Sequence, residues 1–168
     1  MQEHLKSRYC NLDLHRPILS EDTATFYLYN LSGQIVGYQQ YRPKGEKKPQ
    51  NNPKEGKYFT YAHQPTVTVF GVETLKFPGP VFITEGIFDA CRLTYYNRPT
   101  LAILSNNNPG VRNFLYILNR PTVAICDNDD AGKKLAKFGT YKETVQGCHD
   151  LGDAPQKYID YLLHKYRN

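Results

Sequence analysis

The sequence lacks any stretch of about 20 apolar residues, the length that a membrane-spanning helix requires. Its first ten residues, MQEHLKSRYC, also lack the apolar segment of a secretory signal peptide. We therefore expect a soluble protein that stays inside the cell. Charged residues make up 22% and apolar residues 40% of the 168 residues, which is typical of a globular chain and excludes a disordered one. This length predicts one ordinary domain with at most a small appendage.

Paired cysteine motifs are also missing. The four cysteines are scattered and form no CxxC pair, which excludes a zinc ribbon and a thioredoxin-type motif. Cys91 and Cys126 stand among apolar neighbours, so we predict buried thiols that pack as small hydrophobic side chains. Free thiols of this kind fit a reducing compartment.

Positive charge is concentrated in one segment, residues 42–57. The net charge of the chain is +5, and this segment, RPKGEKKPQNNPKEGK, contributes +4 from six Lys or Arg and two Glu. Its Pro, Gly and Asn content predicts an exposed, mobile loop. Two interpretations stay open from composition: a loop that lysines keep soluble, or an arm that follows phosphates.

The N-terminal part of the chain has the pattern of strands. Residues 24–41 predict a β-hairpin that turns at Ser32 and Gly33. Residues 57–75 predict a short extended stretch and then a turn or brief helix. The Pro-Gly-Pro at residues 78–80 is the expected boundary between a β-rich subdomain, residues 1–79, and a second domain, residues 80–168.

From residue 81 short apolar runs alternate with amphipathic stretches. This alternation predicts an α/β domain with a central, mostly parallel sheet flanked by helices. The last segment, APQKYIDYLLHKY, predicts a packing helix with one apolar face. The alternating segments are VFIT, GIFDACRLTYY, TLAIL, VRNFLYILN, TVAIC and DAGKKLAKFG.

Acidic residues stand where two of the predicted strands end. Glu85 directly follows VFIT, Asp127 directly follows TVAIC, and Asp129 comes two residues later. If these strands lie close together in the sheet, the three carboxylates converge at its carboxyl edge. Grouped carboxylates repel one another and need a cation, and Mg²⁺ prefers such oxygen ligands.

Each acidic segment, when it is taken alone, is weak evidence for a metal site. DNDDAG fits a turn in which Asp130 caps the following helix, and ITEG has even less specificity. Their order is more informative, because a third acidic segment, HDLGDA with Asp150 and Asp153, follows them. The ordered set predicts a site for one or two metal ions, the arrangement that polymerases and nucleases use.

These segments resemble a known family. VFITEGIFDA, TVAICDNDDAG and HDLGDAPQKYI resemble the Toprim domain of bacterial and phage DNA primases, in which EGxxD, DxDxAG and KDxx[DE] elements occur in this order. Upstream, LSGQIVGYQQYRP, KYFTY and VFGVETL resemble the N-terminal half of the primase RNA-polymerase domain. The resemblance covers residues 24–160.

The resemblance implies a Toprim fold and a role for each matching residue. Glu85 would lie near the reacting hydroxyl and the metals, and Asp127 and Asp129 would be the principal metal ligands. Asp89 and Asp150 would complete the acidic cluster. Asp153 is a further metal-ligand candidate that could instead cap the last helix.

The implied cofactor is Mg²⁺, with Mn²⁺ as an alternative and no zinc. Nucleotide and nucleic acid would be bound by basic residues, namely Arg42, Lys44, Lys57 and His149. Two departures from the family pattern are visible: SNNNPG replaces a Gly-containing loop after TLAIL, and His149 stands where a Lys is usual.

The implied function is template-directed synthesis of short RNA primers from NTPs on single-stranded DNA, a nucleotidyltransferase activity. Expected partners are a replicative helicase or a separate zinc-binding subunit, because neither region is recognisable in the sequence, and the expected location is the cytoplasm, of a host cell if a phage encodes the chain. Two alternatives stay open. One is a Toprim-type, metal-dependent nuclease that acts on RNA or DNA, and the other is a non-catalytic nucleic-acid-binding subunit of a replication complex.

Overall fold

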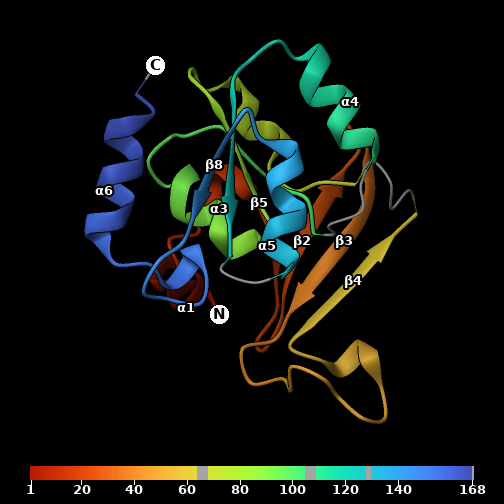
Figure 1. Ribbon diagram of the computed structural model, residues 1–168. Coiled ribbons are helices and arrows are strands. Elements are labelled where there is room, and N and C mark those ends of the chain that lie inside the picture. Colours follow the sequence, from red (N-terminus) through yellow and green to blue (C-terminus); the bar gives the residue numbers. More distant parts are fainter. Residues whose placement is uncertain (64–67, 105–108, 128–129, 168) are drawn as a thin grey trace.

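The computed structural model describes residues 1–63, 68–104, 109–127 and 130–167 (Figure 1). Asp129 and most of the SNNNPG segment lie outside these ranges. The described residues form an antiparallel sheet of order β1-β2-β3-β4 and a parallel sheet of order β6-β5-β7-β8. Helices flank the parallel sheet, so the predicted α/β Toprim architecture with a β-rich N-terminal part is confirmed.

The antiparallel sheet contains the predicted hairpin. Asn30 organises the turn between β2 and β3, because its side-chain oxygen accepts hydrogen bonds from the backbone N–H groups of Ser32 and Gln34. Gly33 completes this turn with a positive φ of 78°. The hairpin prediction is therefore confirmed. The strands are β1 (Ile18–Leu19), β2 (Ala24–Tyr29), β3 (Ile35–Tyr41) and β4 (Tyr58–Ala62).

The basic segment, residues 42–57, connects β3 to β4 as a mostly exposed loop, as predicted. It contains one short 3-10 helix, η1 (Pro53–Glu55). Two backbone hydrogen bonds close the base of the loop. The N–H of Arg42 donates to the carbonyl oxygen of Lys57 (2.9 Å), and the N–H of Lys57 donates to the carbonyl oxygen of Glu46 (2.7 Å). The loop therefore extends the hairpin beyond the sheet (Figure 1, orange to yellow).

Two helices that the sequence pattern did not predict precede the sheet, α1 (Gln2–Ser7) and α2 (Leu12–His15). They have six and four residues, which is too short for a helical period to show in the sequence. Leu5 and Cys10 are buried in a cluster with the first residues of α3. These helices therefore attach the N-terminus to the parallel sheet.

The parallel sheet follows the predicted alternation, with β5 between β6 and β7. Every residue of β5, β6 and β7 is buried, because helices cover both faces of the sheet. Its strands are β5 (Val81–Thr84), β6 (Thr100–Ala102), β7 (Thr122–Cys126) and β8 (Tyr141–Thr144). β8 was not predicted, since its four residues are largely exposed and carry no apolar pattern.

The helices divide between the two faces of this sheet. Residues of α4 and α5 pack in one hydrophobic cluster, and residues of α3 and α6 pack in another on the opposite face. Ile159 and Leu162 of α6 are buried, which confirms the last segment as a packing helix. None of the described helices has the length and apolar character of a membrane span. The helices are α3 (Ile87–Thr94), α4 (Pro109–Ile117), α5 (Asp130–Leu135) with η3 (Ala136–Phe138), and α6 (Gln156–Lys165).

One segment, residues 68–70, connects the two sheets. Val69 forms an antiparallel bridge with Tyr29 at the end of β2, and Phe70 forms one with Ala102 at the end of β6. The two sheets also share a hydrophobic cluster, in which the rings of Tyr41 and Phe88 lie 4.6 Å apart. The two sheets are therefore packed together, although the Pro-Gly-Pro at residues 78–80 lies between them in the sequence. The domain boundary at residue 79 stays a prediction.

Gly71, which directly follows this connecting segment, provides a test of how tightly the segment is fixed. It has a φ of 96°, and a Cβ atom here would overlap the carbonyl oxygen of Thr100. We expect Gly71→Ala to lower the free energy of unfolding by roughly 3 kcal/mol or more, because backbone strain and overlap combine.

Gly33→Ala is the matched control, because Gly33 also has a positive φ but no atom within 4 Å of the added Cβ. Gly33→Ala should lower the free energy of unfolding by only about 1–2 kcal/mol. Urea unfolding of both variants measures the difference. Equal losses would contradict the close approach at Gly71.

Candidate active site

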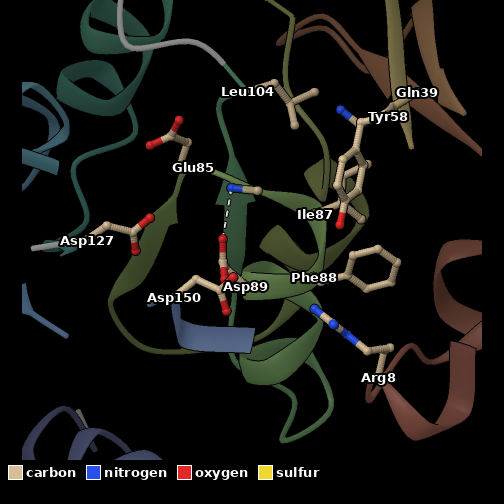
Figure 2. Close-up of a pocket in the computed structure, with 11 residues that line it drawn as sticks. Arg8, Gln39, Tyr58, Glu85, Ile87, Phe88, Asp89, Leu104, Asp127 and Asp150 are labelled. Carbon is tan, nitrogen blue, oxygen red and sulfur yellow. Dashed lines mark hydrogen bonds between the residues drawn. The ribbon is translucent and has the colours of Figure 1, made fainter. Parts of the chain in front are cut away.

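A cavity of about 290 Å³ lies at the carboxyl end of β5 and opens between the two sheets. The antiparallel sheet contributes Gln39 and Tyr58 to its wall, and Arg8 enters from the end of α1 (Figure 2). The other lining residues belong to the parallel-sheet domain. They are Glu85, Gly86, Ile87, Phe88, Asp89, Leu104, Asp127 and Asp150.

Among the described residues, four carboxylates line this cavity. Glu85 and Asp127 directly follow β5 and β7, which are neighbouring parallel strands, so both residues reach the same edge of the sheet. Asp150 comes from the segment after β8, and Asp89 comes from the first turn of α3 (Figure 2). The sequence prediction that Glu85 and Asp127 converge is confirmed, while Asp129 lies outside the described residues.

Asp127 is held in place by the helix that follows it. A Cβ atom at Gly132, in α5, would overlap the carbonyl oxygen of Asp127, so the helix approaches the Asp127 backbone closely. Only glycine permits this approach. This contact explains in physical terms why a glycine stands at residue 132, at the end of the DNDDAG segment.

Asp89 connects two of the segments that line the cavity. Its carboxylate accepts hydrogen bonds from the backbone N–H groups of Gly86 (3.1 Å) and Gly152 (2.9 Å). Burial and the nearby charge of Asp150 raise the pKa of Asp89 to about 7, and the two hydrogen bonds only partly offset this shift. Asp89 therefore positions the turn after β5 against residues 150–152, and its role as a metal ligand stays a prediction.

The third acidic segment places its two aspartates differently. Asp150 lines the cavity and also caps the short helix η4 (Leu151–Asp153), since its side chain accepts from the N–H of Asp153 (2.9 Å). Asp153 does not line the cavity; its side chain is 61% exposed and lies 3.6 Å from the guanidinium of Arg8. The alternative that Asp153 caps the last helix is wrong, because α6 has Pro155 at its N-cap position.

The basic candidates do not line the acidic cavity. Arg42 and Lys44 line a second cavity of about 900 Å³ beside the N-terminus. Lys57 closes the base of the loop through its backbone, and His149 is exposed in the segment before Asp150. None of these four side chains lines the acidic cavity, so their nucleotide and nucleic-acid roles stay predictions.

Sequence reasoning missed three polar side chains that line the cavity, those of Arg8, Gln39 and Tyr58. Arg8 is the one basic residue in the lining, and its guanidinium lies 4.7 Å from the centre of the Phe88 ring. Burial raises the pKa of Tyr58 to about 12, so its hydroxyl stays protonated at neutral pH. Gln39 and Tyr58 lie in segments that resemble the primase family, but the sequence assigns them no role at the site, because only packing between the two sheets brings these side chains to the acidic residues.

The kind of donor at this cavity fits Mg²⁺. All the acidic donors are carboxylate oxygens, and burial together with the charge of Asp150 raises the pKa of Asp89, so a bound cation is favoured here. Among the described residues, no three His, Cys, Asp or Glu side chains lie close enough to form a metal site by themselves. A Mg²⁺ ion held by one or two carboxylates, waters and substrate phosphates does not need such a group.

Comparison with known proteins gave matches in structure only. No protein-family model and no curated protein matches the sequence. The fold is similar to the primase fragment of the bacteriophage T7 primase-helicase protein, with a TM-score of 0.62 and 12% identity over 94% of this chain and 69% of that one. It is also similar to the Aquifex aeolicus primase, comprising zinc-binding and RNA polymerase domains, with a TM-score of 0.64 and 18% identity over 98% and 54%.

A third similar structure is the DnaG primase catalytic domain bound to ssDNA, with a TM-score of 0.60 and 13% identity over 91% of this chain and 59% of that one. The chain thus spans between about half and two thirds of the length of these primase structures. At such identities the likeness establishes the fold. This chain has the fold of a primase catalytic core, an antiparallel sheet joined to a Toprim domain.

Proposed function

We propose that this chain is a primase-type nucleotidyltransferase, which joins ribonucleotides into short primers on a single-stranded DNA template. One observation carries the proposal: Glu85 and Asp127 follow adjacent parallel strands and line one cavity in a chain with the primase catalytic fold. A similar structure, the DnaG catalytic domain, is bound to ssDNA, which supports the choice of template.

Five residues have a proposed task in this reaction. Asp127 and Asp129 would hold Mg²⁺, which when bound neutralises the phosphates and lowers the pKa of the attacking hydroxyl. Glu85 would accept a proton from that hydroxyl, and Asp89 would keep Glu85 in place through the turn at Gly86. Arg8 would draw the anionic nucleotide to an otherwise acidic cavity.

The antiparallel sheet favours primer synthesis over the alternative of a Toprim nuclease. Its residues Gln39 and Tyr58 form the wall that faces the carboxylates, so this sheet is a part of the site. Metal-dependent cleavage needs only the acidic cluster, whereas template and nucleotide together need a wider binding surface. A replicative helicase and a separate zinc-binding subunit remain proposed partners.

Primer synthesis tests the proposal directly. With template, NTPs and Mg²⁺ or Mn²⁺, the chain should make short oligoribonucleotides, and Glu85→Gln or Asp127→Asn should lower the rate by roughly 100-fold or more. Asp160→Asn, at an exposed position on α6, is the control and should leave the rate unchanged. Product that persists in both active-site variants would sink the assignment, and metal-dependent cleavage of the template without NTPs would favour the nuclease.

The pH dependence of stability in EDTA tests the raised pKa of Asp89, which burial and the charge of Asp150 cause. The pKa of Asp89 is about 7 in the folded chain and ordinarily 3.8, so between these values the folded state holds a proton that the unfolded state has lost. The contribution of this proton to the free energy of unfolding is complete below about pH 4 and is lost as the pH rises through 7. The free energy of unfolding should therefore fall over this range more steeply in the wild type than in Asp89→Asn.

Parallel curves for the two proteins in urea unfolding would contradict the raised pKa of Asp89. Asp13→Asn, at an exposed position in α2, controls for the loss of one charge and should follow the wild type.

Millimolar Mg²⁺ at pH 8 should raise the melting temperature of the wild type, because a bound cation stabilises the folded state alone, and should have little effect on Asp127→Asn.

A further inference from the structure

The outer face of the antiparallel sheet is unusually aromatic. Strand residues alternate between two faces, and Phe26, Leu28 and Tyr41 point inward to the core. The residues between them point away from it, and the pairing of β3 with β4 adds two more to the same face. This face carries Thr25, Tyr27, Tyr29, Val36, Tyr38, Gln40, Phe59 and Tyr61, five of which are aromatic.

Three of these tyrosines form a row across the strands. Tyr27 of β2 pairs with Tyr38 of β3, and Tyr38 pairs with Tyr61 of β4. The ring centres of Tyr38 and Tyr61 are 5.6 Å apart, and the ring centre of Phe59, which also belongs to β4, lies 6.2 Å from that of Tyr38. The row lines a shallow hollow of about 380 Å³.

This hollow is open to solvent. Tyr61 is 51% exposed and Ile35, at the start of β3, is 57% exposed. Adjacent exposed aromatic rings cost hydrophobic free energy in a protein that has no ligand for them, so such a patch marks an interaction surface. Flat rings in register on neighbouring strands can each accept a base by stacking.

Positive charge continues this face at one end. Arg42 comes directly after β3, and its Nη2 donates a hydrogen bond to Oε1 of Gln40 (3.0 Å), which is the outward residue that pairs with Phe59. The basic loop, residues 42–57, begins here and carries a charge of +4. Aromatic rings that can stack bases therefore lie beside cations that can attract phosphates. This combination suits a single strand of nucleic acid, since a duplex conceals the faces of its bases.

We propose that the outer face of β2, β3 and β4 is a stacking platform for single-stranded DNA. Bases stack on Tyr27, Tyr38 and Tyr61, and the backbone follows the basic loop. This platform is distinct from the acidic cavity, which Gln39 and Tyr58 line from the inner face of the same sheet. The choice of DNA over RNA rests on the proposed function, in which the template is DNA.

Binding of a fluorescent oligothymidylate in EDTA without NTPs tests the platform. Tyr61→Ala should raise the Kd roughly tenfold, and Tyr38→Ala combined with it should raise the Kd further, because each stacked base is lost separately. Tyr141→Ala is the matched control, since Tyr141 is 52% exposed on β8 of the other sheet, and its Kd should stay at the wild-type value. An unchanged Kd in Tyr61→Ala would overturn the proposal, as would tighter binding of an oligouridylate of the same length.

Intrinsic fluorescence gives a second readout that does not depend on a destabilising substitution. The chain has no tryptophan, so its emission comes from tyrosine, and stacked bases should quench it. Tyr38→Phe with Tyr61→Phe should keep the wild-type Kd but lose a part of the quenching. Unchanged quenching in this variant would place the DNA elsewhere.

The acidic residues separate this proposal from the proposed function. Asp127→Asn should bind the oligonucleotide as the wild type does, because the platform lies on the other face of the sheet. If the wild type makes no primers while Tyr61→Ala still weakens binding, the platform stands and the proposed function fails. If primers are made and Tyr61→Ala binds normally, the platform alone fails.

Discussion

The site depends on one constraint, the parallel pairing of β5 with β7, in which Ile83 lies opposite Ala124. This register puts Glu85 and Asp127 together at the carboxyl ends of two fully buried strands, where neighbouring carboxylates repel each other. The surrounding structure responds to that repulsion. Two backbone N–H groups donate to Asp89, and the guanidinium of Arg8 is at the rim of the cavity.

The second sheet makes this edge into a cavity. The segment at residues 68–70 bridges the ends of β2 and β6, which fixes the antiparallel sheet against the parallel sheet. The inner face of that sheet supplies a polar wall, and its outer face supplies aromatic rings next to the basic loop. One small sheet thus carries two surfaces with different chemistry, separated only by its own thickness.

Sequence analysis predicted the parts that depend on local pattern. The hairpin turn, the alternating strands and helices, and the positions of Glu85 and Asp127 at strand ends all follow from residues close in sequence. Long-range packing was beyond its reach: Arg8 and Tyr58 reach the cavity only through contacts between the sheets, and β8 has no apolar pattern. The capping alternative for Asp153 was wrong because η4 intervenes before α6.

The central claim is that this cavity holds the metal ions for nucleotidyl transfer. The most direct measurement is anomalous X-ray scattering from crystals of the chain grown with Mn²⁺ and a nucleotide. The account predicts manganese peaks in the cavity between Glu85 and Asp127, with the nucleotide phosphates beside them. A cavity without manganese, in crystals that bind the ion or the nucleotide elsewhere on the chain, would contradict it.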